Sequence, residues 1–223
     1  MLMPTIGLIA EGPTDHVVLE NILIGHFDDY DMSQYIRYLQ PLRDATDAAG
    51  SKGGWTRVLE YCRSTLFRDA FEENDFLIIQ IDSDRLNEKP FELNLAQPVE
   101  ILIEQAVQQF EQLIILAFGV EFLTDHRMRI IFAIAVNEIE CWLLPLLFSD
   151  KTASATNNCL FKLNQQLSTR KEKPIHPKAK AVRQYEQLSR DFCKPKSLVV
   201  AAQKNPSLGI FSRNLDLQFH GQI

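Results

Sequence analysis

The sequence predicts an α/β protein with a mostly parallel, four-stranded sheet flanked by helices and a C-terminal helical extension. Short apolar runs alternate with amphipathic segments, which is typical of strands joined by crossover helices. Three of the apolar runs end in carboxylates, and the charge balance of the chain changes sign after residue 150. The alternation predicts the fold class, and the carboxylates predict where a site lies.

The first strand and helix are expected within residues 6–23, where an apolar run breaks at Gly-Pro and resumes at helical spacing. The first apolar run is too short for a helix and fits a buried strand. Glu11 then follows the carboxyl end of that strand, where open α/β sheets bind ligands. The alternative is that Glu11 only borders a loop and that Thr14 or Asp15 caps the helix.

The next segments predict a second strand, a loop and a helix. Residues 34–39 end before a proline and are rich in strand formers, so they predict a strand. Residues 43–54 are rich in Asp, Ala, Gly and Ser, which is typical of a flexible loop. Residues 55–71 carry apolar side chains on one face and predict one helix.

The clearest strand covers residues 75–82, a nearly continuous apolar run of the kind that parallel sheets bury on both faces. It ends in D-S-D-R, which places Asp82 and Asp84 two residues apart. If the strand geometry persists, their side chains lean to the same side, roughly 6–7 Å apart along the chain. Such a pair can hold a divalent cation, although D-x-D is also common in turns.

A long helix over residues 99–119 leads to a fourth buried strand over residues 130–136. That strand is followed by N-E-I-E-C-W-L-L, which contains Glu138 and Glu140 and continues as an apolar helix to residue 148. Parallel strands bring their carboxyl ends to one edge of the sheet. Three strand ends with carboxylates therefore predict a metal site at that edge.

The net charge of -6 conceals two regions of opposite sign. Residues 1–150 hold 10 Lys and Arg against 25 Asp and Glu, and residues 151–223 hold 13 against 4. The polar, small-residue segment 150–158 is the expected boundary between an acidic α/β domain, residues 1–150, and a basic helical extension, residues 151–223. An acidic region joined to a basic one suits a protein that acts on a phosphate polymer, whereas the alternative is an ordinary solvated helix face.

The basic extension predicts helices over residues 178–192, 196–202 and 210–217. Its cations are the expected nucleic-acid contacts, with three side chains foremost: Lys178, Lys180 and Arg183. Tyr185 is expected in the core.

The four cysteines form no C-x-x-C pair, so neither a zinc site nor a disulfide is expected and the thiols should be reduced. The longest apolar run is too short to cross a bilayer, and no secretory pattern precedes it. These features predict a cytoplasmic protein without a membrane partner. They do not predict its oligomeric state.

E-G-P-T-D, I-D-S-D and E-I-E-C-W-L-L occur in this order, each after an apolar strand, and together resemble the TOPRIM domain. That family includes topoisomerases, bacterial primases, OLD-type nucleases and small bacterial families linked to anti-phage defence. The resemblance covers roughly the first two-thirds of the chain. It implies that Glu11, Asp82 and Asp84 hold Mg²⁺ or Mn²⁺ for phosphodiester chemistry. Asp15 matches the last position of the first motif. In the third motif, Glu140 rather than Glu138 matches the additional acidic residue of the nuclease-like branches.

The chain departs from the larger relatives because it lacks an ATPase domain, a tyrosine-bearing topoisomerase domain and the zinc-finger and polymerase parts of primases. Any partner ATPase would be a separate chain. The resemblance therefore favours a Mg²⁺- or Mn²⁺-dependent nuclease acting on DNA or RNA, with a role in anti-phage defence. The alternative is a non-catalytic module that keeps the TOPRIM scaffold and binds nucleic acid or a partner.

Overall fold

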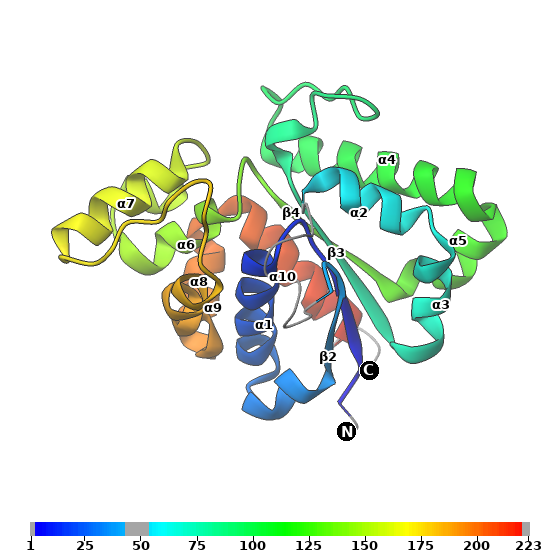
Figure 1. Ribbon diagram of the computed structural model, residues 1–223, viewed down its shortest axis with the longest axis horizontal. Coiled ribbons are helices and arrows are strands. Elements are labelled where there is room, and N and C mark those ends of the chain that lie inside the picture. The colour runs from blue at the N-terminus through cyan, green and yellow to red at the C-terminus, as the bar shows by residue number, and fades with distance from the viewer. Residues whose placement is uncertain (1–2, 43–53, 220–223) are drawn as a thin grey trace.

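A computed structural model describes residues 3–42 and 54–219 and contains one four-stranded, entirely parallel sheet (Figure 1). The strands are β1 (Ile6–Ile9), β2 (Ile36–Gln40), β3 (Phe76–Asp82) and β4 (Ile130–Ala135), in the order β2-β1-β3-β4. The α/β class and the four parallel strands predicted from the sequence are therefore confirmed.

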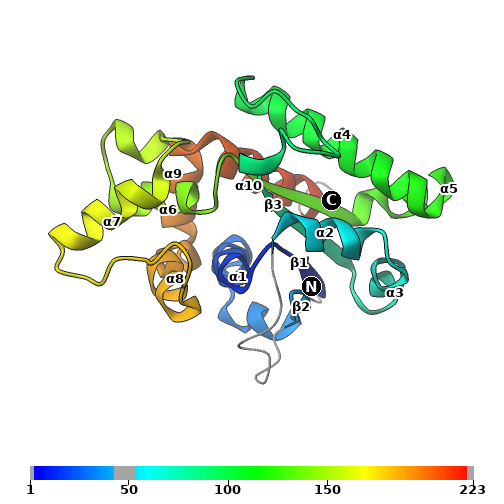
Figure 2. The same ribbon diagram turned by 45° about the horizontal axis from the view of Figure 1, so that its top comes forward.

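The helices follow the strands and cover both faces of the sheet (Figure 2). The helices between β1 and β4 are α1 (Pro13–Phe27), α2 (Trp55–Cys62), α3 (Thr65–Glu73), α4 (Val99–Phe118) and α5 (Val120–His126). Those after β4 are α6 (Glu140–Leu147), α7 (Cys159–Thr169), α8 (Val182–Ser189), α9 (Pro195–Lys204) and α10 (Pro206–Phe219). Short 3-10 turns include η2 (Ser83–Arg85) and η5 (Arg190–Cys193).

Alternation along β3 divides its side chains between two hydrophobic clusters. Leu77, Ile79 and Ile81 join α2 to α5 on one face, whereas Ile78 joins α1 and the C-terminal helices on the other. Because side chains alternate along a strand, Gln80 and Asp82 follow Ile78 onto the α1 face. The sheet therefore directs two polar side chains of its central strand toward α1.

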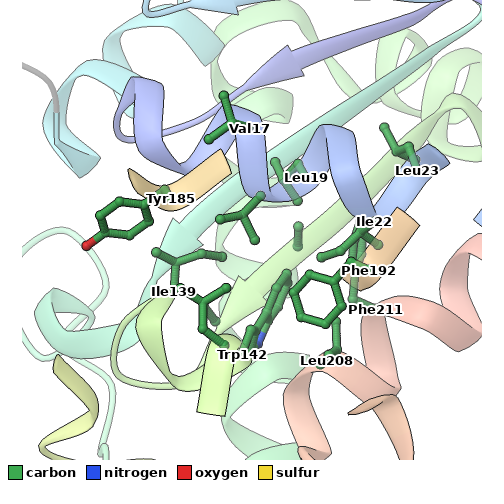
Figure 3. Packing of buried hydrophobic residues seen from close by; sticks show 14 of the residues in the cluster. Val17, Leu19, Ile22, Leu23, Ile139, Trp142, Tyr185, Phe192, Leu208 and Phe211 are labelled. Atoms are coloured by element: carbon green, nitrogen blue, oxygen red, sulfur yellow. The ribbon is translucent and has the colours of Figure 1, made fainter. Parts of the chain in front are cut away.

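The α1 face carries the larger cluster, which includes residues from both ends of the chain (Figure 3). Trp142 of α6 stacks on Phe211 of α10, with ring centroids 5.4 Å apart, and its indole N–H donates to Ser207 Oγ at 2.8 Å. A Cβ added to Gly25 of α1 would lie 1.8 Å from the Phe192 carbonyl oxygen. Helix α1 is therefore covered by segments that lie far from it in the sequence.

Two predicted helices have different limits in the structure. Residues 55–71 form two helices rather than one, since α2 ends at Cys62 and α3 begins at Thr65. The backbone amide and hydroxyl of Ser64 both donate to the Tyr61 carbonyl, at 3.0 and 2.8 Å, and this turn separates the helices. The helix predicted from residue 178 begins only at Val182.

The expectation of four reduced cysteines is wrong for two of them. Cys141 and Cys159 form a disulfide, with Cα atoms 5.0 Å apart, and both are buried. They stand at the starts of α6 and α7, which the fold places side by side, and no local spacing pattern signals such a contact. Cys62 and Cys193 are free and buried.

Among the described residues, α4 has the length and hydropathy of a helix that could span a membrane. The core helix of a soluble protein meets the same test. In this fold Ala106, Phe110 and Ile114 of α4 are buried against the sheet. The loop expected at residues 43–54 lies outside the described residues except for Gly54.

Candidate metal centre

Glu11 lies directly beyond β1, and hydrogen bonds hold both its backbone and its side chain. Its backbone amide donates to Gln80 Oε1 at 3.2 Å, and its carbonyl accepts from the Gly54 amide at 2.7 Å. Its side-chain Oε1 accepts from the Asp82 amide at 2.8 Å. The positive φ of Gly54 (111°), which favours glycine, allows this approach. Glu11 therefore connects the ends of two neighbouring strands.

Gln80 holds Asp82 from within β3. Its side chain is fully buried, and its Nε2 donates to Asp82 Oδ1 at 2.9 Å while its Oε1 accepts from Glu11. Sequence reasoning missed this residue, although a glutamine within an apolar strand was the available signal. Gln80 orients Asp82 and the Glu11 backbone together.

Asp84 differs in orientation from the sequence-based expectation. The strand ends at Asp82, and residues 83–85 turn into η2, so the two aspartates do not continue one strand face. The turn is held to the end of β4, because the Asp84 amide donates to the Asn137 carbonyl at 3.1 Å and Ser83 Oγ accepts from the Asn137 amide at 2.7 Å. Asp84 is exposed, and it lies at the rim of the site that Glu11 and Asp82 occupy.

Asp15 and Glu140 enter the site from the first turns of α1 and α6. Both side chains are buried, Asp15 at 5% and Glu140 at 0% exposure. Glu140 Oε1 accepts from Lys180 Nζ at 2.6 Å and from the Tyr185 hydroxyl. Within the described residues its other oxygen, Oε2, is buried and has no hydrogen-bond partner. A buried carboxylate oxygen without a donor is costly and favours a nearby cation.

These acids perturb one another, and we call Glu11, Asp15, Asp82 and Glu140 the acidic cluster. Burial, followed by the charges of Asp15 and Asp84, raises the pKa of Glu11 to about 8 against the opposing Asp82 hydrogen bond. Burial and the Glu140 charge raise the pKa of Asp15 to about 7. Burial and the Glu11 charge raise the pKa of Asp82 well above its usual range. The cluster is therefore short of positive charge.

Lys180 contributes a cation to the acidic cluster from the loop before α8. Burial alone would lower its pKa, but the carboxylates of Glu140, Asp82 and Asp15 together outweigh burial and raise it. Tyr185, in the first turn of α8, is buried, and burial and Glu140 raise the pKa of its hydroxyl. Figure 3 shows Tyr185 at the margin of the apolar cluster, with its hydroxyl directed away from the labelled side chains. The sequence assigned Tyr185 to the core without this polar contact.

Three other residues considered in the sequence lie outside the acidic cluster. Glu138 Oε1 accepts from the Leu160 amide at 2.9 Å and so faces the start of α7. Lys178 is exposed in the loop before α8. Arg183 lines a separate cleft between α6 and α8. Of the three predicted nucleic-acid contacts, the structure brings only Lys180 to the acids.

The acidic cluster offers only carboxylate oxygens, which are the ligands that Mg²⁺ and Mn²⁺ prefer. As the side chains stand, no group of three or more His, Cys, Asp or Glu in residues 3–42 and 54–219 is close enough to hold a metal ion. Lys180 supplies the positive charge instead. Compared with protein-family models, curated proteins and solved structures, the chain matches none.

The oxygen set, the unpartnered Glu140 oxygen and the raised pKa values are compatible with a divalent cation, provided that the acids shift toward one another. Binding would exchange the protons held by Asp15 and Asp82, whose pKa values are raised, for the charge of the ion. The arrangement is thus a set of acids at the carboxyl edge of a parallel sheet, and Lys180 neutralises their charge only in part.

Proposed function

We propose that this chain is a Mg²⁺- or Mn²⁺-dependent nuclease of the TOPRIM type. The observation that carries the proposal is the buried Glu140, which has one oxygen without a donor and lies within electrostatic reach of Asp15 and Asp82. The motif resemblance supports the same assignment. A divalent cation would satisfy this oxygen and neutralise its acidic neighbours.

The residues that would hold the ion are Asp15, Asp82 and Glu140, with Glu11 beside them and Asp84 at the rim. When bound, the ion would polarise the scissile phosphate and lower the pKa of an attacking water. Gln80 would keep Asp82 oriented through the bond at 2.9 Å. Lys180 and the Tyr185 hydroxyl would hold Glu140 in place.

Glu11 suits proton transfer in this reaction. Its pKa of about 8 lies close to neutrality, which is favourable for a general acid or base. Its carboxylate accepts hydrogen bonds from the backbone amides of Asp82 and Trp55, which fix its orientation. At pH 7 the Glu11 carboxyl group would hold a proton that it could give to the leaving oxygen of a cleaved phosphodiester.

The test is metal binding followed by cleavage. Wild type, Asp82→Asn and the exposed control Asp125→Asn are titrated with Mn²⁺ and Mg²⁺ by calorimetry, then incubated with labelled single-stranded DNA, duplex DNA and RNA. We expect Asp82→Asn to lose both metal binding and cleavage by about 100-fold or more, and the control to keep both. A wild-type protein that binds no metal at millimolar concentration would refute the proposal.

A second candidate is a non-catalytic TOPRIM-like module that binds nucleic acid or a partner. The ion pair of Lys180 with Glu140 at 2.6 Å favours it, because a resident cation partly neutralises the acids. This candidate predicts that Asp82→Asn binds nucleic acid as wild type does and that neither protein cleaves it.

A further inference from the structure

A cleft lies between the end of α6, the end of α7 and α8, and we call it the α6–α8 cleft. Its volume is about 680 Å³, within the range of sites that take small ligands. Leu146, Leu147 and Leu188 supply apolar surface, and all three are only partly buried. The three helices lie on the same side of α1 in both ribbon views (Figures 1 and 2).

Basic side chains surround this apolar surface. Arg170, Lys173 and Arg183 line the cleft, are exposed, and form no ion pair with any residue in the described part of the chain. Of the two acids in the lining, Asp191 is paired with Lys194 at 2.7 Å, which leaves only Glu172 to oppose the three cations. The cleft therefore presents unneutralised positive charge above an apolar surface.

Two glutamines add hydrogen-bonding capacity to the cleft. Gln184 and Gln187 lie one turn apart on α8 and both line it. Gln184 Nε2 donates to the Lys173 carbonyl at 2.6 Å, which joins the loop after α7 to α8. An apolar surface, guanidinium groups and amides together match a nucleotide, whose base can stack and form edge hydrogen bonds while its phosphate meets the cations.

The cleft is adjacent to the acidic cluster through two helices. Helix α6 begins at Glu140, in the acidic cluster, and ends at Leu147, in the cleft. At a rise of about 1.5 Å per residue, the helix separates the two sites by roughly 10 Å. On α8, Tyr185 contacts Glu140 while Arg183 and Gln184 line the cleft. Stacked nucleotides advance about 3.4 Å each along a strand, so roughly three of them span this separation.

We propose that the α6–α8 cleft binds a base and its phosphate in a single-stranded nucleic acid, about three nucleotides from the acidic cluster. This inference rests on the proposed nuclease function of the acidic cluster, at which the same strand would be cut. The cleft determines how the strand is held, whereas the acidic cluster acts on the phosphodiester bond.

Binding is tested without cleavage by fluorescence anisotropy of a labelled single-stranded 12-mer, in EDTA, over a series of salt concentrations. The variant is Arg170→Gln with Arg183→Gln. The matched control is Arg63→Gln with Arg68→Gln, two exposed arginines near α3 that undergo the same change of charge. We expect the cleft variant to bind on the order of tenfold more weakly and its salt slope to fall by about 0.7, the contribution of one phosphate contact on a single strand.

Equal losses in the control and the cleft variant would overturn the proposal, since long-range charge would then explain binding. Displacement of the oligonucleotide by a polyglutamate peptide as readily as by unlabelled oligonucleotide would also overturn it, because the cleft would be a general anion or acidic-peptide site. Lys173→Gln, made separately, should give a smaller loss in the same direction.

The two proposals fail in different ways. Oligonucleotide binding that depends on the cleft, combined with a wild-type protein that never cleaves, would refute the nuclease and support the cleft. Cleavage that depends on Asp82, combined with full binding and activity in the Arg170→Gln, Arg183→Gln variant, would support the nuclease and refute the cleft.

Discussion

Raising the pH from 5 to 7 in the absence of divalent cations should destabilise the folded protein. Burial is the main cause of the raised pKa values of Glu11, about 8 against 4.5, and of Asp15, about 7 against 3.8. Across this window the folded state keeps protons that the unfolded chain has released. The free energy of unfolding therefore falls as the pH rises.

The size of the effect follows from the number of protons retained. One group protonated only in the folded state changes the free energy of unfolding by about 1.4 kcal/mol per pH unit. Two independent groups would double this value, but neighbouring carboxylates titrate as one interacting set. We therefore expect a fall of roughly 1 to 2 kcal/mol per pH unit between pH 5 and 7.

The assay is urea unfolding followed by tryptophan fluorescence at pH 5, 6, 7 and 8 in EDTA. Glu11→Gln removes one titrating group and should reduce the pH dependence markedly, whereas the exposed control Glu72→Gln should keep it. A wild-type free energy of unfolding that stays constant or rises across this window would refute the reasoning. So would an unchanged slope in Glu11→Gln.

Three further predictions concern stability at pH 7, each measured by urea unfolding. Gly25→Ala should cost about 2–3 kcal/mol or more, because its Cβ would lie 1.8 Å from a backbone carbonyl; wild-type stability would contradict this. Tyr185→Phe removes a donor to buried Glu140 and should cost about 1–3 kcal/mol; a stabilised variant would contradict the assigned contact. Reduction of the disulfide, which spans 18 residues, should cost about 3 kcal/mol, whereas Cys141→Ala with Cys159→Ala should not respond to reductant; identical wild-type curves with and without reductant would contradict the pairing.

The strands could be predicted from the sequence to within about two residues, because buried parallel strands require continuous apolar runs. Residues 75–82 were expected as a strand, and β3 covers Phe76–Asp82. The break between α2 and α3 was missed because it depends on the two hydrogen bonds of Ser64 to the Tyr61 carbonyl rather than on a change in apolar pattern. Local bonding of this kind leaves little trace in composition.

The gathering of Glu11, Asp82 and Glu140 was predictable, since it follows from the parallel direction of the strands. The contacts of Glu140 could not be predicted, because Lys180 and Tyr185 reach it only through the packing of α8 on α1. The Cys141–Cys159 disulfide escaped prediction for the same reason. In each case the contact joins residues of different helices, and no repeat or spacing in the sequence indicates that these helices pack together.

The coverage of α1 by distant segments has a consequence for synthesis on the ribosome. Helix α1 is synthesised well before α8 and η5, which pack against it. The side chains of α1 that α8 and η5 bury therefore stay uncovered until those later segments have been synthesised. Lys180 directly precedes α8, so a chain interrupted before residue 180 lacks both the α8 and η5 cover of α1 and the counter-charge of Glu140.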